Sequence, residues 1–343
     1  MIEFLNGGIL TTVQDDGRRA FQRYGMSVAG AMDKFSFVLS NVIAGNRKRN
    51  TAVLEVTHAG PHIKFHRTNI FAVCGADFSA TLDGVPIENN RAYIASEGSI
   101  LRMGAAKNGC RGYITFHGGL DIDKVMGSRS TFIKGQIGGL EGRAVKKGDR
   151  IGFVDPSTAL PNLEYRFFGH DFGMHPSCNQ VIRVIEGPQA DYFSPVGMAR
   201  FLSSEYEVTH ESGRMGYRLA GEPISHAHGK NGDIISDGIP LGAIQVPKDQ
   251  PIIMMADRQT TGGYTKIASV ISADLPYVAQ LRAGDKIHFK MVSIEEAQDL
   301  YIKRMQFFQR LFRQLNEAKI IDRHIYKIKA GSESFDIALS EKL

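Results

Sequence analysis

Tryptophan is absent from this sequence of 343 residues, and cysteine is scarce, with only Cys74, Cys110 and Cys178. No two cysteines form a C-x-x-C pair, so the pattern supports neither a disulfide framework nor a zinc knuckle. Isolated cysteines of this kind are expected to be buried, reduced thiols. The sequence therefore predicts no metal site.

Several common catalytic motifs are also missing. The sequence contains no G-x-x-x-x-G-K-[ST] loop, no H-E-x-x-H and no G-x-S-x-G. A standard nucleotide P-loop, a zinc peptidase helix and a hydrolase nucleophile elbow are therefore excluded.

Long apolar runs are missing too. No stretch approaches the roughly 18 residues that a membrane helix needs. Residues 1–19 have neither the basic start nor the apolar centre of a secretory signal peptide. We therefore expect a cytoplasmic protein that does not enter a membrane.

Charge of one sign dominates only near the C-terminus. The whole chain carries 41 Lys and Arg against 36 Asp and Glu, a net charge of +5. Residues 293–329 alone carry eight basic and five acidic side chains, which leaves +3 in that stretch. The solvated face of a helix explains this concentration better than a nucleic-acid surface, so we do not expect nucleic acid as a partner.

The sequence is rich in glycine, with 37 residues, and in short apolar runs. Each run is bounded by Gly, Pro, Asn or Asp; examples are 52–57, 70–74, 111–116, 181–185 and 251–255. This spacing is typical of closed or partly closed β-barrels and not of βαβ units. A mostly β fold with few helices is therefore predicted.

Two helices interrupt this pattern. Residues 32–44 have apolar side chains at i, i+3, i+4, i+7 and i+8, with Asp33 at the N-terminal end. A C-terminal helix begins with a capping box, Ser293 with Glu296, and is expected to continue to about Lys319.

We divide the chain into three parts. An N-terminal β-rich domain is predicted over 1–160, a C-terminal β-barrel domain over 177–292, and a helical extension over 293–343. The extension is expected to pack on the body or on a second copy of the chain, so a homo-oligomer is left open. Residues 330–343 look like a polar tail.

The densest polar segment follows an apolar strand over 252–256. Residues 257–266 read Asp-Arg-Gln-Thr-Thr-Gly-Gly-Tyr-Thr-Lys, so a carboxylate, a guanidinium, an amide, hydroxyls, a phenol and an ammonium fall within ten residues. Such a strand-to-loop junction can surround a small polar ligand with donors. The alternative is a tight turn whose side chains satisfy one another.

Three further segments carry polar side chains next to glycine. Arg129 and Arg143 could grip a carboxylate or phosphate, or could brace loops. Arg214 and Tyr217 lie in a similar segment, which is either a cationic loop or a brace. Gln245 would aim an amide from a strand end, unless it is bonded to backbone.

Taken in order, these segments resemble one family. It is the carboxyltransferase-type family that includes allophanate hydrolase subunit two, the matching half of urea carboxylase and the C component of 5-oxoprolinase. It also includes the antagonist of a sporulation histidine-kinase inhibitor. The matching stretches are 30–33 with 45–46, 54–57 with 60–61, 127–131, 214–219, 242–247 and 257–264. The helix after Ser293 lies outside the resemblance.

The resemblance implies two cyclophilin-like barrel domains and a companion, kinase-inhibitor-like subunit (allophanate hydrolase subunit 1-type). Its 5-oxoprolinase branch implies a complex that opens 5-oxoproline to glutamate with ATP. Its urea carboxylase branch implies transfer of a carboxyl group from carboxybiotin, held by another chain, to urea or a related small amide. A regulatory protein that antagonises a kinase inhibitor, without catalysis, is the third alternative.

Both enzyme alternatives act on a small amide whose oxygen or nitrogen gains charge in the transition state, where fixed donors and cations lower the barrier. Asp257 could orient or deprotonate an amide N–H. Lys266 or Arg214 could stabilise the charged oxygen. Substrate contacts are expected from the remaining candidates: Gln245, Thr260, Thr261, Tyr264, Tyr217, Arg129 and Arg143.

Overall fold

The structure is a computed structural model that describes residues 1–46, 51–169, 180–316, 320–330 and 333–342, with side chains described up to residue 316. Cys178, Lys319 and the predicted domain start at 177 lie outside the described residues. No described helix is both long enough and apolar enough to span a membrane.

The N-terminal half consists of two antiparallel sheets. The larger sheet has the strand order β11 (Leu120–Asp121), β12 (Arg150–Phe153), β1 (Ile2–Asn6), β4 (His62–Phe65), β9 (Ile100–Arg102), β6 (Thr81–Leu82) and β7 (Val85–Pro86). The smaller sheet has the order β2 (Leu10–Gln14), β3 (Val53–Thr57), β10 (Arg111–Phe116), β5 (Asn69–Gly75) and β8 (Arg91–Ala95).

The smaller sheet is covered on both faces, as strand β5 shows. Phe71 and Val73 join the core between the two sheets. Ile70, Ala72 and Cys74 alternate with them and pack against the helices α1 (Lys34–Ile43) and α4 (Ile294–Asn316). Successive side chains of a strand point to opposite faces, so a strand covered on both sides reads as a continuous apolar run.

The second half closes into a barrel. Its strand order is β13 (Gln180–Glu186), β20 (Lys266–Val270), β17 (Ala243–Gln245), β18 (Ile252–Met254), β15 (Gly216–Gly221), β14 (Tyr206–Val208) and β21 (Lys286–Met291). Strands β13 and β21 pair in parallel and complete the ring. Outside the ring lie α2 (Pro195–Ser203), α3 (Leu275–Gln280) and a two-stranded sheet of β16 (Asp233–Gly238) and β19 (Thr261–Tyr264).

Short 3-10 helices occupy four connections: η1 (Gln22–Tyr24), η2 (Ile133–Gly135), η3 (Leu163–Tyr165) and η4 (Ala190–Tyr192). Beyond α4 the chain forms a hairpin of β22 (Ile320–Ala330) and β23 (Glu333–Lys342). The prediction of a polar tail over 330–343 is therefore wrong. Alternation such as Ser-Phe-Asp-Ile-Ala-Leu-Ser within 334–340 is the strand signal that the polar composition concealed.

The predicted mostly β fold with few helices is confirmed. Helix α1 has Asp33 as its N-cap, whose Oδ1 accepts hydrogen bonds from the N–H groups of Phe35 and Ser36, each 2.9 Å long. Helix α4 starts where the capping box places it, with the Glu296 N–H donating to the Ser293 hydroxyl over 3.1 Å. Cys74 and Cys110 are buried free thiols.

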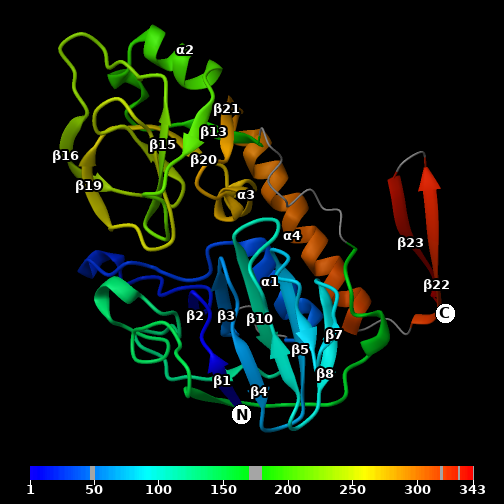
Figure 1. The fold of residues 1–343 in the computed structure, drawn as a ribbon. Coiled ribbons are helices and arrows are strands. Elements are labelled where there is room, and N and C mark those ends of the chain that lie inside the picture. Colours follow the sequence, from blue (N-terminus) through cyan, green and yellow to red (C-terminus); the bar gives the residue numbers. More distant parts are fainter. Residues whose placement is uncertain (47–50, 170–179, 317–319, 331–332, 343) are drawn as a thin grey trace.

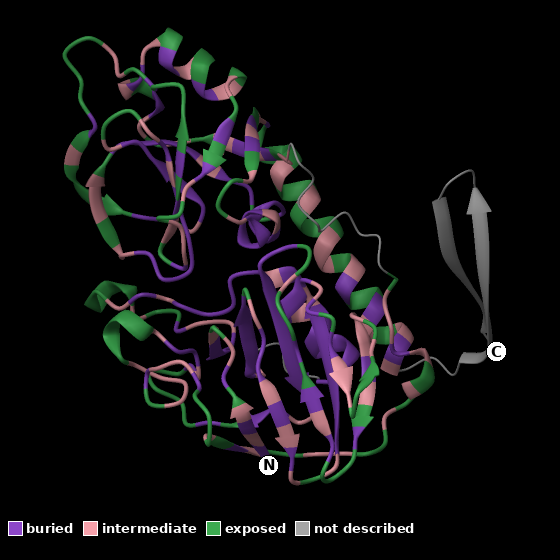
Figure 2. Ribbon diagram, in the orientation of Figure 1, coloured by how far each residue is buried: buried purple, intermediate pink, exposed green. Residues whose placement is uncertain are grey.

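Helix α4 connects the two halves (Figure 1). Near its start, Ala297 and Leu300 pack beside barrel residues such as Ile271. Near its end, Phe308 and Leu315 pack into the core that α1 shares with the smaller sheet. Figure 2 shows the purple buried interior of both halves and the mixed exposure along this helix.

Candidate functional site

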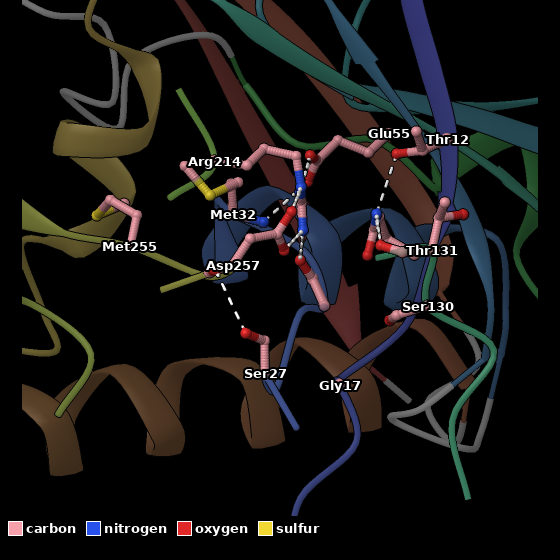
Figure 3. A network of polar contacts seen from close by, with 12 residues as sticks. Thr12, Gly17, Ser27, Met32, Glu55, Ser130, Thr131, Arg214, Met255 and Asp257 are labelled. Atoms are coloured by element: carbon pink, nitrogen blue, oxygen red, sulfur yellow. Dashed lines mark hydrogen bonds and ion pairs between the residues drawn. The ribbon is translucent and has the colours of Figure 1, made fainter. Parts of the chain in front are cut away.

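The polar segment after β18 starts at the junction of the two halves. The Asp257 N–H donates to the Arg214 carbonyl over 2.8 Å. The Ser27 hydroxyl, from the segment before α1, donates to the Arg258 carbonyl over 2.8 Å. The same hydroxyl lies 3.4 Å from the Asp257 carbonyl (Figure 3), so the turn after β18 is held against the N-terminal half.

Arg214 is the centre of this junction. Its Nε and Nη2 donate to the two carboxylate oxygens of Asp257, over 2.9 and 2.8 Å. Nη1 donates to Glu55 Oε1, and Nη2 also reaches the Gly30 carbonyl over 2.8 Å. A guanidinium fork shared by two carboxylates is a strong, directional contact. Arg214, which directly precedes β15 of the barrel, is therefore linked to β3 of the first half.

Glu55 continues the network into the first half. Its Oε2 accepts from the Met32 N–H and the Tyr113 hydroxyl, each over 2.8 Å. Burial pushes the pKa of Glu55 upward, but Arg214 and then Arg111 outweigh it and hold the pKa below its ordinary value. The carboxylate therefore stays ionised inside the protein.

A second chain of contacts runs beside the first. Gln280 Nε2 donates to Asp33 Oδ2 over 2.7 Å and to the Arg111 carbonyl over 2.9 Å. Arg111 Nη1 donates to the Tyr217 hydroxyl over 2.5 Å. Burial raises the pKa of Tyr217 to about 12. Tyr217, a predicted substrate contact, is thus part of the junction.

Asp15 organises the loop that follows β2. Its carboxylate accepts from the hydroxyls of Ser128 and Ser130, over 2.6 and 2.5 Å, and from the Arg129 and Gly17 N–H groups, over 2.7 and 2.8 Å. Burial raises the pKa of Asp15, but these hydrogen bonds outweigh it and lower the pKa. Glycine-rich segments far apart in sequence meet here.

Arg18 lies next to this loop and is 1% exposed. Its Nη2 donates to the Ser130 carbonyl. Among the described residues, its Nε and Nη1 have no hydrogen-bond partner. Burial lowers the pKa of Arg18, with Asp15 and then Asp257 opposing the shift through their charges.

Gln245 and Lys266 form a second group, on neighbouring strands of the barrel. They are opposite one another on β17 and β20, and each is 1% exposed. Lys266 Nζ contacts Asp237 Oδ2 over 3.3 Å, from β16. Gln245 Nε2 has no hydrogen-bond partner among the described residues. An ammonium and an amide thus offer buried donors on paired strands.

Thr260, Thr261 and Tyr264 lie between Asp257 and Lys266 in sequence. The Thr260 carbonyl accepts from the Ile239 N–H over 3.0 Å. Thr261 and Tyr264 are exposed residues of β19, opposite Gly238 and Asp233. The segment 257–266 therefore consists of a turn after β18, the short strand β19 and the start of β20.

Arg129 and Arg143 brace their own loops. Arg129 Nε donates to the Ile122 carbonyl over 2.6 Å. Arg143 donates to Asp149 over 2.7 and 3.1 Å and to Glu141. Their guanidinium groups have partners within the same half, so both arginines brace loops there.

Sequence reasoning did not single out Glu55, Asp15 and Arg18 as functional candidates. Glu55 sits in an apolar strand, Val-Leu-Glu-Val-Thr, and a charged residue at a strand position buried on both faces was the available signal. Asp15 and Arg18 carry no such signal, because their partners are more than 100 residues away. The described residues hold no group of three or more His, Cys, Asp or Glu suited to a metal ion.

A family model and two full-length relatives relate this chain to the same group of proteins. The family model "carboxyltransferase domain, subdomain A and B" matches residues 24–291. The chain is 35% identical to the C component of 5-oxoprolinase from Escherichia coli over 319 residues, 92% of this chain and 97% of that protein. The corresponding protein of Haemophilus influenzae is also 35% identical, over 92% of this chain and 99% of its own.

Longer proteins contain a similar region. Urea amidolyase of Saccharomyces cerevisiae is 34% identical over 324 residues, which are 89% of this chain and 18% of that protein. The crystal structure of the Kluyveromyces lactis urea carboxylase superposes with a TM-score of 0.83 at 29% identity, over 100% of this chain and 32% of that chain.

The barrel, the paired sheets and these matches define the class: the chain belongs to the carboxyltransferase domain, subdomain A and B family. Within that family it is homologous to the C component of 5-oxoprolinase and to a region of urea carboxylase.

Proposed function

We propose that this chain is one subunit of a 5-oxoprolinase, which opens 5-oxoproline to glutamate with ATP and works together with a companion subunit. The observation that carries the proposal is the near full-length relationship to two proteins named as the C component of 5-oxoprolinase. The urea amidolyase match covers only a small part of that protein.

At the residue level, we propose Lys266 and Gln245 as the groups that contact the amide of the substrate. Opening a lactam puts negative charge on the former carbonyl oxygen. A buried ammonium and a buried amide N–H can stabilise that charge without reorganising solvent. The partner of Lys266, Asp237, is itself 57% exposed at its side chain, so this ion pair can rearrange.

Asp257 and Arg214 take a positioning role in this proposal. Both oxygens of Asp257 are bound by Arg214 and the residue is buried, so this carboxylate is engaged within the protein. Their pairing instead fixes the start of the segment that leads to β19 and β20. In sequence, Thr260, Thr261 and Tyr264 lie between this pair and Lys266, and we propose them as further substrate contacts.

ATP and biotin are proposed only at the level of the assembled complex. In such a complex, ATP would provide a phosphoryl group for the amide oxygen and biotin would provide a carboxyl group. Lys266 and Gln245 fit such groups, since both present N–H donors and both are buried. These side chains would orient the anionic oxygens.

The test is turnover by the assembled complex. The chain is co-expressed with its neighbouring-gene products, and glutamate formed from 5-oxoproline and ATP is measured. Lys266→Met should lower kcat/KM by about 10²–10³. Lys286→Met, which removes an exposed β21 lysine paired with Glu205, is the matched control and should retain activity. Equal activity of Lys266→Met and wild type would refute the role of Lys266.

The second candidate is a carboxyltransferase acting on urea with carboxybiotin. The family model and the urea amidolyase relatives favour it. An assembled complex that carboxylates urea and forms no glutamate would replace the first proposal with this one.

A further inference from the structure

Arg18 has an unusual environment for a buried cation. The residue is 1% exposed, and two of its three guanidinium nitrogens have no hydrogen-bond partner among the described residues. A buried charge is costly unless it is paired and hydrogen-bonded, so an arginine in this state calls for a partner.

The neighbouring carboxylates do not serve as that partner. Asp15 and Asp257 act on Arg18 through their charges, but neither forms an ion pair with it within the described part of the chain. Asp15 already accepts four hydrogen bonds, from Ser128, Ser130 and two backbone N–H groups. Both oxygens of Asp257 are bound by Arg214.

Arg166 provides the contrast. It is 0% exposed, and all three of its guanidinium nitrogens donate to acceptors of the protein. Nε donates to Ile43 O, Nη2 to Val42 O and Nη1 to Leu315 O, over 2.8, 3.1 and 2.7 Å. Arg166 is thus a buried arginine with every guanidinium nitrogen bonded, whereas Arg111 has one nitrogen without a partner and Arg18 has two, among the described residues.

Gly138 and the residues that follow Arg18 in sequence are neighbouring parts of the chain. Gly138 approaches so closely that a Cβ there would lie 2.5 Å from Arg18 Nη2, and its φ is +68°. On the other side, residues 19–26 bond mainly among themselves, as in Tyr24 N–H to Phe21 O and Gly25 N–H to Gln22 O. This loop can move without breaking a sheet.

We propose that Arg18 is the anchor of a binding site for a small oxyanion, such as a carboxylate or an inorganic oxyanion, at the junction of the two halves. Nε and Nη1 are the donors that such a ligand occupies. Guanidinium groups form their strongest hydrogen bonds with anionic oxygens.

The experiment compares thermal unfolding midpoints at equal ionic strength, with chloride as the reference anion. The probes are sodium bicarbonate, inorganic phosphate, acetate, 5-oxoproline and, as a neutral oxygen donor, acetamide. At least one oxyanion at ten times its dissociation constant should raise the wild-type midpoint by about 2–4 °C. The effective probe distinguishes an inorganic from a carboxylate ligand.

Variants assign the effect to Arg18. Arg18→Met should abolish the oxyanion response, and its midpoint in chloride should not fall, because an unpaired buried charge is removed. Arg166→Met should have a lower midpoint and a normal response.

Three outcomes would overturn the proposal. They are the absence of any oxyanion response in the wild type, an unchanged response in Arg18→Met, and a response to acetamide alone. A fourth is a thermal midpoint of Arg18→Met that falls as far as that of Arg166→Met, because it would show that Arg18 has only a structural role. None of these outcomes depends on turnover of 5-oxoproline, so the two proposals can fail separately.

Discussion

At the scale of single residues, the most informative feature is the charge buried between the halves. Glu55 is 1% exposed and shares Arg214 with Asp257. Replacing Glu55 with Gln leaves the guanidinium with one counter-ion fewer in a place that water does not reach. Removing one partner of a buried ion pair is far more damaging than removing one at the surface.

Glu55→Gln should lower the free energy of unfolding by about 3–5 kcal/mol. Urea denaturation followed by circular dichroism measures it, since the chain has no tryptophan for intrinsic fluorescence. Glu205→Gln, which removes an exposed partner of Lys286, is the control and should cost under about 1 kcal/mol. Similar losses for both variants would contradict the buried-network interpretation.

Acid sensitivity follows from the same carboxylates. The pKa values of Glu55 and Asp15 are lowered in the folded state, so the folded protein binds fewer protons at these sites than the unfolded chain. Their contribution to stability is complete above the ordinary carboxylate pKa, near about 4, and is lost as pH falls through the lower folded values.

Thermal midpoints measured from pH 7 to pH 3 should therefore be level at first and then fall steeply below about pH 4. In Glu55→Gln the fall should be smaller, because one of the titrating groups is gone. If the midpoint of Glu55→Gln fell as steeply below pH 4 as that of the wild type, Glu55 would not contribute to the acid sensitivity.

At the scale of elements, the N-cap of α1 also contacts a helix of the other half. The Asp33 carboxylate binds two helix N–H groups, the Ser36 hydroxyl (2.6 Å) and Gln280 of α3 (2.7 Å). Burial raises its pKa. One side chain thus starts a helix of the first half and receives a contact from the second.

Asp33→Ala should cost about 2 kcal/mol or more, the upper end of the range for an N-cap. Asp33→Asn should recover only part of this loss. Its amide oxygen can still accept from the helix, but its Nδ2 cannot accept the N–H of Gln280. Calorimetric midpoints of the two variants give the order of their stabilities. A lower midpoint for Asp33→Asn than for Asp33→Ala would contradict this prediction.

Arg166 joins the ends of two helices by donating to the last carbonyls of α1 and α4. Arg166→Met should therefore speed amide exchange in the last turn of α4, near Leu315, and leave the first turn near Ile294 unchanged. Hydrogen-exchange mass spectrometry measures both turns in one experiment. Uniform exchange along the helix would show that the cap does not act locally.

Local patterns were sufficient to predict particular elements. The stripe of 32–44 and the capping box at Ser293 predict α1 and the start of α4, because periodicity and caps are properties of neighbouring residues. Arg214 was predicted as a polar candidate, but its partner Glu55 is 159 positions away. No local pattern encodes that pairing, and the closure of β13 on β21 is equally non-local.

At the scale of the whole molecule, two β-rich halves share one polar junction. Arg111 of β10 reaches Tyr217 and the Ala279 carbonyl of the barrel half, each over 2.5 Å. Together with Arg214 and Gln280, it ties side chains of one half to backbone and side chains of the other. The halves are therefore expected to unfold together.

Scanning calorimetry of the wild type should show one transition. Arg111→Met removes donors to Tyr217 and Ala279 and should split it into two, or broaden it measurably. Arg91→Met, at a partly exposed pair with Glu88, is the control and should leave one sharp transition. Two transitions already present in the wild type would contradict the coupling.

Helix α4 sets a limit on how the molecule can flex. Its 23 residues span about 35 Å, and its opposite ends are anchored on different halves. A hinge motion that separated the halves would have to bend this helix or break the packing contacts at one of its ends. We therefore expect that a ligand bound at the junction leaves the relative orientation of the two halves unchanged.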